Sequence, residues 1–134
     1  MKILIVEDRQ FWIDTIKTCA LKAGGGDIEI AKNEIEVMKK IELSTIDIAV
    51  VDLNFSDLMQ EEEGYEGINL IKRINQENHE TNIIVVTGYM HFDPEEFGKK
   101  YHVEKMFLKS RFEKNGFTNF LRGMIKKKLG EGDG

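Results

Sequence analysis

Four predominantly apolar runs, each ending in a polar or charged residue, constrain the fold of this chain more than any other feature. They are Lys2–Val6 before Glu7 and Asp8, Ile46–Val51 before Asp52, Ile83–Val86 before Thr87, and Met106–Leu108 before Lys109. Continuous runs of β-branched and aliphatic residues are typical of strands buried on both faces of a sheet. A fifth, alternating run at 27–31 indicates one more strand.

Segments with helical periodicity separate these strands. We expect helices over 9–23, from the N-cap Asn33 onward, over 67–74, from Pro94 to about Tyr101, and in a closing segment that ends near 129. Either Ser110 or Asn115 could cap the closing helix. Strands that alternate with helices predict an α/β fold, in which helices cover both faces of a parallel sheet.

Length and composition bound the organisation of the chain. A chain of 134 residues with 41% hydrophobic side chains can build one core. We therefore expect one domain over 1–129 and a flexible tail or linker stub over 130–134. No apolar run is long enough for a membrane span or a signal peptide, so a cytoplasmic protein is expected. The single cysteine, Cys19, excludes a disulfide framework and a cysteine-rich metal site.

The formal net charge of -5 is concentrated in the first half of the chain. The basic run Lys126–Lys128 lies on the closing helix, where a solvated helix face is the simpler interpretation. An acidic protein without a basic recognition motif gains little phosphate-driven affinity, so we expect no direct nucleic-acid binding. The acidic first half favours a cation site.

The polar residues at the strand ends are expected to meet, because ligands of open α/β sheets bind outside the carboxyl ends of the strands. Each residue alone has an ordinary explanation as a solvated strand end. Three carboxylates that lie together repel one another unless they bind a cation. Mg²⁺ is the expected cation, since it binds hard oxygen ligands together with phosphate oxygens. An aspartate carboxylate can also act as a nucleophile and form an acyl phosphate.

With these residues identified, the chain resembles the receiver domains of two-component response regulators, of the chemotaxis-regulator type. The markers are Ile-Leu-Ile-Val-Glu-Asp at 3–8, Val-Val-Asp-Leu-Asn at 50–54, Gly-Ile-Asn-Leu-Ile-Lys-Arg-Ile at 67–74, Val-Val-Thr-Gly at 85–88 and Phe-Leu-Lys at 107–109. The resemblance covers nearly the whole chain. It implies a flavodoxin-like, doubly wound sheet of five parallel strands in the order 2-1-3-4-5.

The resemblance also implies a role for individual residues. Asp52 would be the phosphoacceptor. Mg²⁺ would be held by Glu7, Asp8, Asp52 and the backbone carbonyl of Asn54. Thr87 and Lys109 would bind the phosphoryl group, and Met106 stands where the family usually has a switch aromatic. Asn54 and Tyr89 would tune dephosphorylation.

A receiver domain is a signalling switch rather than an enzyme, with chemistry limited to phosphoryl transfer to its own aspartate and autodephosphorylation. The implied phosphodonor is a sensor histidine kinase or a phosphotransfer protein. The implied output is a protein that binds the face formed by the fourth helix, the fifth strand and the last helix. Exposed candidates on that face are Phe92, Lys99, Lys100, His102 and Lys105. The chain would be a monomer or a phosphorylation-dependent dimer.

Four departures from the family pattern leave alternatives open, and one is that the loop between Asp52 and the third helix lacks the proline usual in the family. The loop after Asp52 carries an acidic insertion over 55–66, Ser110 replaces the usual proline after Lys109, and Met106 replaces an aromatic. A pseudo-receiver, which binds proteins without being phosphorylated, is therefore one alternative. A haloacid-dehalogenase-like Mg²⁺ phosphohydrolase is another, since it also uses a strand-end aspartate as nucleophile.

Overall fold

The computed structural model describes residues 1–53, 66–78, 80–88 and 93–130. Within these residues the elements alternate along the chain: β1 Lys2–Val6, α1 Gln10–Lys22, β2 Asp27–Ala31, α2 Glu34–Leu43, β3 Ile48–Val51, α3 Glu66–Glu77, β4 Asn82–Thr87, α4 Pro94–Tyr101, β5 Val103–Leu108, a short 3₁₀ turn Lys109–Arg111, and α5 Lys114–Lys128.

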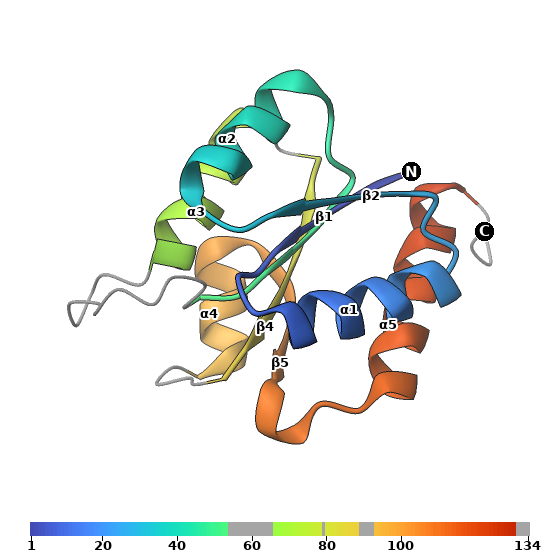
Figure 1. Ribbon diagram of the computed structural model, residues 1–134. Coiled ribbons are helices and arrows are strands. Elements are labelled where there is room, and N and C mark those ends of the chain that lie inside the picture. The colour runs from blue at the N-terminus through green and yellow to red at the C-terminus, as the bar shows by residue number, and fades with distance from the viewer. Residues whose placement is uncertain (54–65, 79, 89–92, 131–134) are drawn as a thin grey trace.

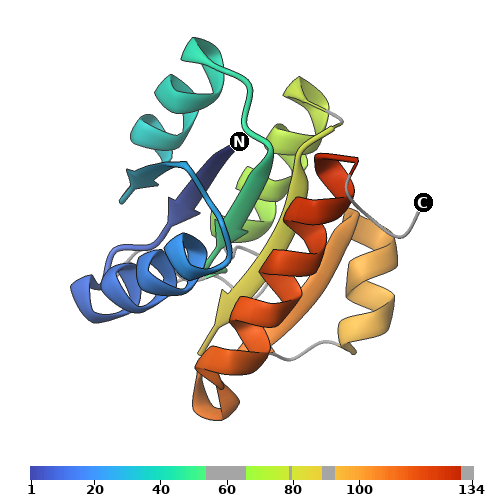
Figure 2. The same cartoon turned by 90° about the vertical axis from the view of Figure 1, so that its right-hand side faces the viewer.

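The five strands form one parallel sheet in the order β2-β1-β3-β4-β5, as predicted. Figure 1 shows α2, α3 and α4 on one side of this sheet and α1 and α5 on the other. Figure 2, turned by 90°, shows α1 and α5 side by side over the same face. The predicted flavodoxin-like architecture is therefore confirmed.

Side chains alternate between two hydrophobic cores along each central strand. In β1, Leu4 and Val6 point into the core covered by α2, α3 and α4, whereas Ile3 and Ile5 point into the core beneath α1 and α5. This two-residue period follows from the pleat of a strand. Both sets are apolar because helices cover both faces, which explains why the central strands have continuous apolar sequences.

Helix starts follow the predicted signals at two places and differ at a third. The Asn33 side chain accepts a hydrogen bond from the backbone N–H of Glu36, and Pro94 begins α4. The α5 prediction was wrong, because Glu113 is the N-cap, and it makes no side-chain capping bond. Ser110 lies instead in the 3₁₀ turn that follows β5. No described helix has the length and apolarity needed to cross a membrane.

The edge strand β5 begins at Val103, three residues earlier than its apolar run suggested. Glu104 and Lys105 are exposed on this edge, and the register with β4 shifts between Ile83 and Ile84. Charged residues are common on edge strands, where they prevent pairing with another chain. Backbone pairing with β4, rather than side-chain hydrophobicity, therefore determines where this strand begins.

Candidate functional site

Strand register brings the predicted acidic residues to one end of the sheet. Val6 of β1 pairs with Val51 of β3, so Glu7 and Asp52 follow directly after neighbouring positions. The backbone N–H of Asp52 donates to the carbonyl of Val6 at 3.1 Å, which holds the two strand ends together. The sheet thus delivers both carboxylates to the same carboxyl-end edge, as the sequence predicted.

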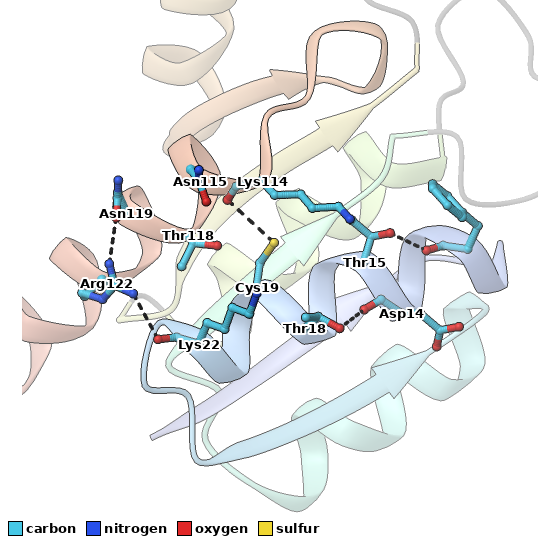
Figure 3. A pocket seen from close by; sticks show the side chains of 11 residues that line it. Asp14, Thr15, Thr18, Cys19, Lys22, Lys114, Asn115, Thr118, Asn119 and Arg122 are labelled. Carbon is cyan, nitrogen blue, oxygen red and sulfur yellow. Dashed lines mark hydrogen bonds between the residues drawn. The ribbon is translucent and has the colours of Figure 1, made fainter.

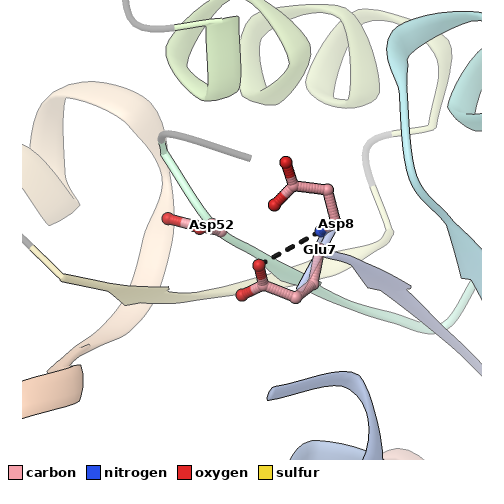
Figure 4. Close-up of side chains that lie close together, drawn as sticks. All are labelled: Glu7, Asp8 and Asp52. Atoms are coloured by element: carbon pink, nitrogen blue, oxygen red, sulfur yellow. Dashed lines mark hydrogen bonds between the residues drawn. The ribbon is translucent and has the colours of Figure 1, made fainter. Parts of the chain in front are cut away.

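The carboxylates of Glu7, Asp8 and Asp52 form a compact cluster (Figure 4), with one oxygen from each lying within 4.8 Å of the others. Glu7 is 1% exposed and Asp52 is 4% exposed. Glu7 Oε1 accepts hydrogen bonds from the backbone N–H groups of Asp8 and Arg9, at 3.1 and 3.2 Å. Among the described residues, no donor makes a hydrogen bond to the buried atoms Glu7 Oε2 and Asp8 Oδ1.

The Lys109 ammonium lies against this cluster from the end of β5. Lys109 Nζ is 2.8 Å from Glu7 Oε2, as an ion pair outside hydrogen-bond geometry, and it donates to Asp52 Oδ2 at 3.1 Å. Its side chain is only 12% exposed. The described residues contain no cis peptide bond, so the Lys109–Ser110 bond is trans. Lys109 contacts Asp52 although Ser110 occupies the usual proline position.

The electrostatics of the cluster disfavour full ionisation. The pKa of Glu7 is raised from 4.5 to about 7, mainly by burial and next by the neighbouring Asp52 carboxylate. Lys109 and the backbone N–H of Arg9 act in the opposite direction, but their combined effect on the pKa is smaller. One ammonium therefore does not fully compensate the buried carboxylates.

The donor set fits a hard divalent cation. The ligand atoms of the cluster are carboxylate oxygens. Among the described residues, Asp8 Oδ1 has no hydrogen-bond donor, and Glu7 Oε2 has only the Lys109 ammonium, 2.8 Å away as an ion pair. Mg²⁺ prefers one or two carboxylates together with waters and phosphate oxygens. Glu7, Asp8 and Asp52 would be its protein ligands here. The predicted fourth ligand, the carbonyl of Asn54, lies outside the described residues.

The other predicted site residues lie at the same edge or beyond the described part of the chain. Thr87 is fully buried at the end of β4 and pairs with Leu108, directly before Lys109. Met106 is partly buried against the core that includes α4. Tyr89 lies outside the described residues, as do residues 55–65 of the acidic insertion predicted over 55–66 and Phe92 on the predicted output face. The other residues predicted for that face, Lys99, Lys100, His102 and Lys105, are exposed.

Gly67, at the start of α3, packs directly on the backbone that follows the candidate phosphoacceptor. Its N–H donates to the carbonyl of Leu53 at 3.0 Å. A Cβ at this position would lie 2.7 Å from the carbonyl oxygen of Asp52, which is closer than real Cβ contacts. Only glycine allows α3 to approach Asp52 this closely.

A groove of about 530 Å³ between α1 and α5 lies apart from the acidic cluster (Figure 3). No carboxylate of the cluster lines it, and neither does Lys109. Several of its polar side chains bond the protein itself: Thr18 donates to the carbonyl of Asp14, and Arg122 donates to the carbonyl of Lys22. We interpret this groove as the joint between two helices rather than as the reactive site.

Sequence reasoning missed the aromatic side of the site. Lys109 Nζ lies over the Trp12 ring, 5.1 Å from its centroid, and Trp12 contacts Phe112 edge-to-face. The helical period over 9–23 predicted only that Trp12 lies in a helix. The position of Trp12 in the sequence could have indicated this contact. Trp12 lies in the first turn of the helix that follows Glu7 and Asp8, so its ring lies near the strand ends.

Comparison with known proteins gives a family match. Residues 3–116 match the model of the response regulator receiver domain family. A search of curated proteins found no match.

Solved structures share the fold along nearly the whole chain. A response regulator receiver domain protein (CheY-like) from Methanospirillum hungatei is 22% identical, with 98% of each chain covered and a TM-score of 0.77. A response regulator from Thermotoga maritima is 25% identical over 93% of this chain and 97% of its own, with a TM-score of 0.76. A Burkholderia pseudomallei response regulator with a phosphorylated aspartic acid and a calcium ion is 17% identical over 98% of this chain and 72% of its own, with a TM-score of 0.71.

Proposed function

The chain belongs to the response regulator receiver domain family of two-component signalling, and on this premise we propose that Asp52 accepts a phosphoryl group with the help of Mg²⁺. The observation that carries the proposal is the direct contact of Lys109 with Asp52 inside a buried cluster of carboxylates. The phosphorylated aspartic acid in the Burkholderia relative adds support. Because the match is to the receiver family, the phosphohydrolase alternative has no support.

The chain's own residues provide a nucleophile and positive charge. A carboxylate oxygen of Asp52 attacks the phosphorus of a phosphohistidine on the partner protein, so that a P–O bond forms while the P–N bond breaks. Lys109 already lies 3.1 Å from Asp52 Oδ2, where its ammonium can neutralise oxygens of the arriving phosphoryl group. Thr87, on the neighbouring strand, offers a hydroxyl to the same group.

Bound Mg²⁺ would supply further charge neutralisation and would orient the phosphoryl oxygens. Glu7 and Asp8 hold carboxylate oxygens ready for it on the β1 side of Asp52. The backbone N–H groups of Asp8 and Arg9 fix one oxygen of Glu7, which leaves the other directed into the cluster. That second oxygen is 2.8 Å from the ammonium of Lys109, which follows β5, so a bound Mg²⁺ would share the Glu7 carboxylate with Lys109.

The output is a change in the face formed by α4, β5 and α5. A phosphoryl group adds about -1.5 to -2 charge and three acceptor oxygens at Asp52. Thr87 and Lys109 terminate β4 and β5, so contacts that they make with this group displace the ends of both strands. Met106 lies two residues before the end of β5, partly buried beside α4. We propose that it moves with this face and changes its affinity for a target protein.

Intact-mass analysis after incubation with acetyl phosphate tests the chemistry. The wild type is expected to gain one phosphoryl group only when Mg²⁺ is present, and Asp52→Asn is expected to gain none. Asp14→Asn is the matched control, because Asp14 is an exposed carboxylate on α1 outside the cluster. It should be phosphorylated like the wild type.

Two outcomes would contradict the proposal. An adduct that persists in Asp52→Asn would move the phosphoacceptor to another residue. A wild type that binds Mg²⁺ but forms no adduct would favour the pseudo-receiver alternative. For the output face, amide NMR spectra recorded with and without the adduct should change at Thr87, Met106 and α4; unchanged signals there would remove the proposed switch.

A further inference from the structure

The Lys109 ammonium lies between two carboxylates and the face of an aromatic ring. Glu7 and Asp52 are 2.8 and 3.1 Å from Nζ, and the centroid of the Trp12 ring is 5.1 Å from it. A cation within about 6 Å of an aromatic centroid is attracted to the negative face of the ring, most strongly for tryptophan. Because the Lys109 side chain is only 12% exposed, water weakens this attraction little.

The ring itself is held from the same turn that carries Lys109. Phe112 meets Trp12 edge-to-face, with centroids 5.2 Å apart and planes at 89°. The backbone N–H of Phe112 donates to the carbonyl of Lys109 at 3.3 Å. Trp12 therefore links the first turn of α1 to both the lysine and the turn after β5.

We propose that Trp12 is a positioning residue that holds the Lys109 ammonium over Asp52 for phosphoryl transfer, an inference that rests on the function proposed above. A lysine has a flexible four-carbon stem and a strongly hydrated ammonium, so its charge can take several positions around a carboxylate. The indole of Trp12 covers one side of the ammonium and restricts its movement in that direction. It thereby raises the fraction of molecules in which the positive charge is already in place.

The indole also differs from the carboxylates in one useful respect. The attraction of Glu7 and Asp52 for Lys109 weakens when their charge is shared with a bound cation. The attraction of a neutral ring does not depend on that charge. Trp12 therefore keeps Lys109 beside Asp52 under the conditions in which the phosphoryl group arrives.

The test compares Trp12→Leu, which removes the ring, with Trp12→Phe, which keeps a smaller aromatic face. Phe11→Leu is the matched control. Phe11 is the neighbouring aromatic residue on α1, its side chain is 69% exposed, and it touches Trp12 edge-to-face rather than lying against Lys109. All three variants change an aromatic side chain in the same turn of α1.

The first readout requires neither metal nor phosphoryl donor. In the metal-free wild type, the ring current of Trp12 should shift the Lys109 ε-methylene proton signals upfield of their position in Trp12→Leu. Phe11→Leu should retain this shift, Trp12→Phe should retain part of it, and Trp12→Leu should lose it. Loss of the shift in Phe11→Leu, or its retention in Trp12→Leu, would overturn the assigned contact.

The second readout is the rate of adduct formation with acetyl phosphate and Mg²⁺. We expect Trp12→Leu to be slower by about fivefold, from the usual strength of a partly buried cation–π contact, and Trp12→Phe to recover much of the rate. Equal rates in Trp12→Leu and the wild type would overturn the positioning role. If Trp12→Leu does not fold, the comparison of Trp12→Phe with Phe11→Leu decides both the NMR shift and the rate of adduct formation. A wild type that forms no adduct refutes the proposed function, and the positioning role with it, whatever the NMR shift shows.

Discussion

Lys109 Nζ lies 2.8 Å from Glu7 Oε2, so an ion pair joins the end of β5 to the end of β1 across the carboxyl edge of the sheet. The same ammonium is 3.1 Å from Asp52 Oδ2. It therefore occupies a position between the residue proposed to hold the metal and the residue proposed to receive the phosphoryl group. Several properties of the site follow from this one cation.

Lys109→Met should bind Mg²⁺ more tightly than the wild type. The substitution removes a positive charge that contacts two proposed ligands and repels a second cation. We expect a gain in affinity of about tenfold at about pH 8, measured by calorimetry or by the fluorescence of Trp12. Lys99→Met, on exposed α4, is the control and should leave the affinity unchanged. Weaker binding in Lys109→Met would show that the lysine assists the metal instead.

The stability of the metal-free protein should depend on Glu7 across the neutral pH range. The pKa of Glu7 is about 7 in the folded protein and 4.5 in its unperturbed state, so the folded protein holds this proton more tightly. The associated stability is fully present below about pH 4.5 and is lost as pH rises through about 7. At about 1.4 kcal/mol per pH unit, the loss amounts to at most roughly 3–4 kcal/mol.

The measurement is the free energy of unfolding in urea between about pH 5 and 8, for the wild type and for Glu7→Gln without Mg²⁺. The glutamine variant lacks this titration. As the pH rises, the wild type should therefore lose stability relative to the variant. A difference that is flat across this range would contradict the raised pKa.

Gly67→Ala should disturb the backbone that carries Asp52. The new Cβ would lie 2.7 Å from the carbonyl oxygen of Asp52, so α3 or the strand end must move. We expect a loss of roughly 1–3 kcal/mol in stability and slower adduct formation. Gly123→Ala is the matched control, because a Cβ there meets nothing within 4 Å inside α5. Denaturant unfolding should show that it stabilises the protein, by about 0.5–1 kcal/mol. Equal stability of the two variants would contradict the close approach of α3.

His102→Gly should stabilise the protein. His102 ends α4 in the left-handed conformation, with φ 58° and ψ 47°, which costs little for glycine but is strained for other residues. Its side chain is exposed, so the substitution removes little packing. We expect a gain of about 0.5–1 kcal/mol, visible as a higher Tm, whereas His102→Ala should give no gain. A lower Tm for the glycine variant would mean that the imidazole makes a stabilising contact.

Most of the fold could be predicted because local patterns and tertiary packing agree along the central strands. The apolar run Lys2–Val6 is β1 without a change of boundary, and Pro94–Tyr101 is α4. Predictions failed where long-range pairing overrides local sequence. Glu104 and Lys105 are charged residues that do not predict a strand, yet β4 pairs with Val103 and Lys105 and so extends β5 across both. The side-chain caps expected for α5 are absent for a similar reason, since the 3₁₀ turn after Lys109 determines where the helix begins.

The sequence by itself determined which polar residue follows each strand. It also determined the chemical groups found there, which are three carboxylates, a hydroxyl and an ammonium. Parallel strands bring their carboxyl ends to one edge, so these residues had to meet once the fold was known. Only the tertiary structure decided how they meet. It placed Lys109 against Glu7 as well as Asp52, buried Glu7 enough to raise its pKa, and set the Trp12 ring beside the ammonium. Lys109 is 57 positions from Asp52 and about a hundred from Glu7 and Trp12. These relations therefore depend on distances and burial that exist only after the helices pack on the sheet.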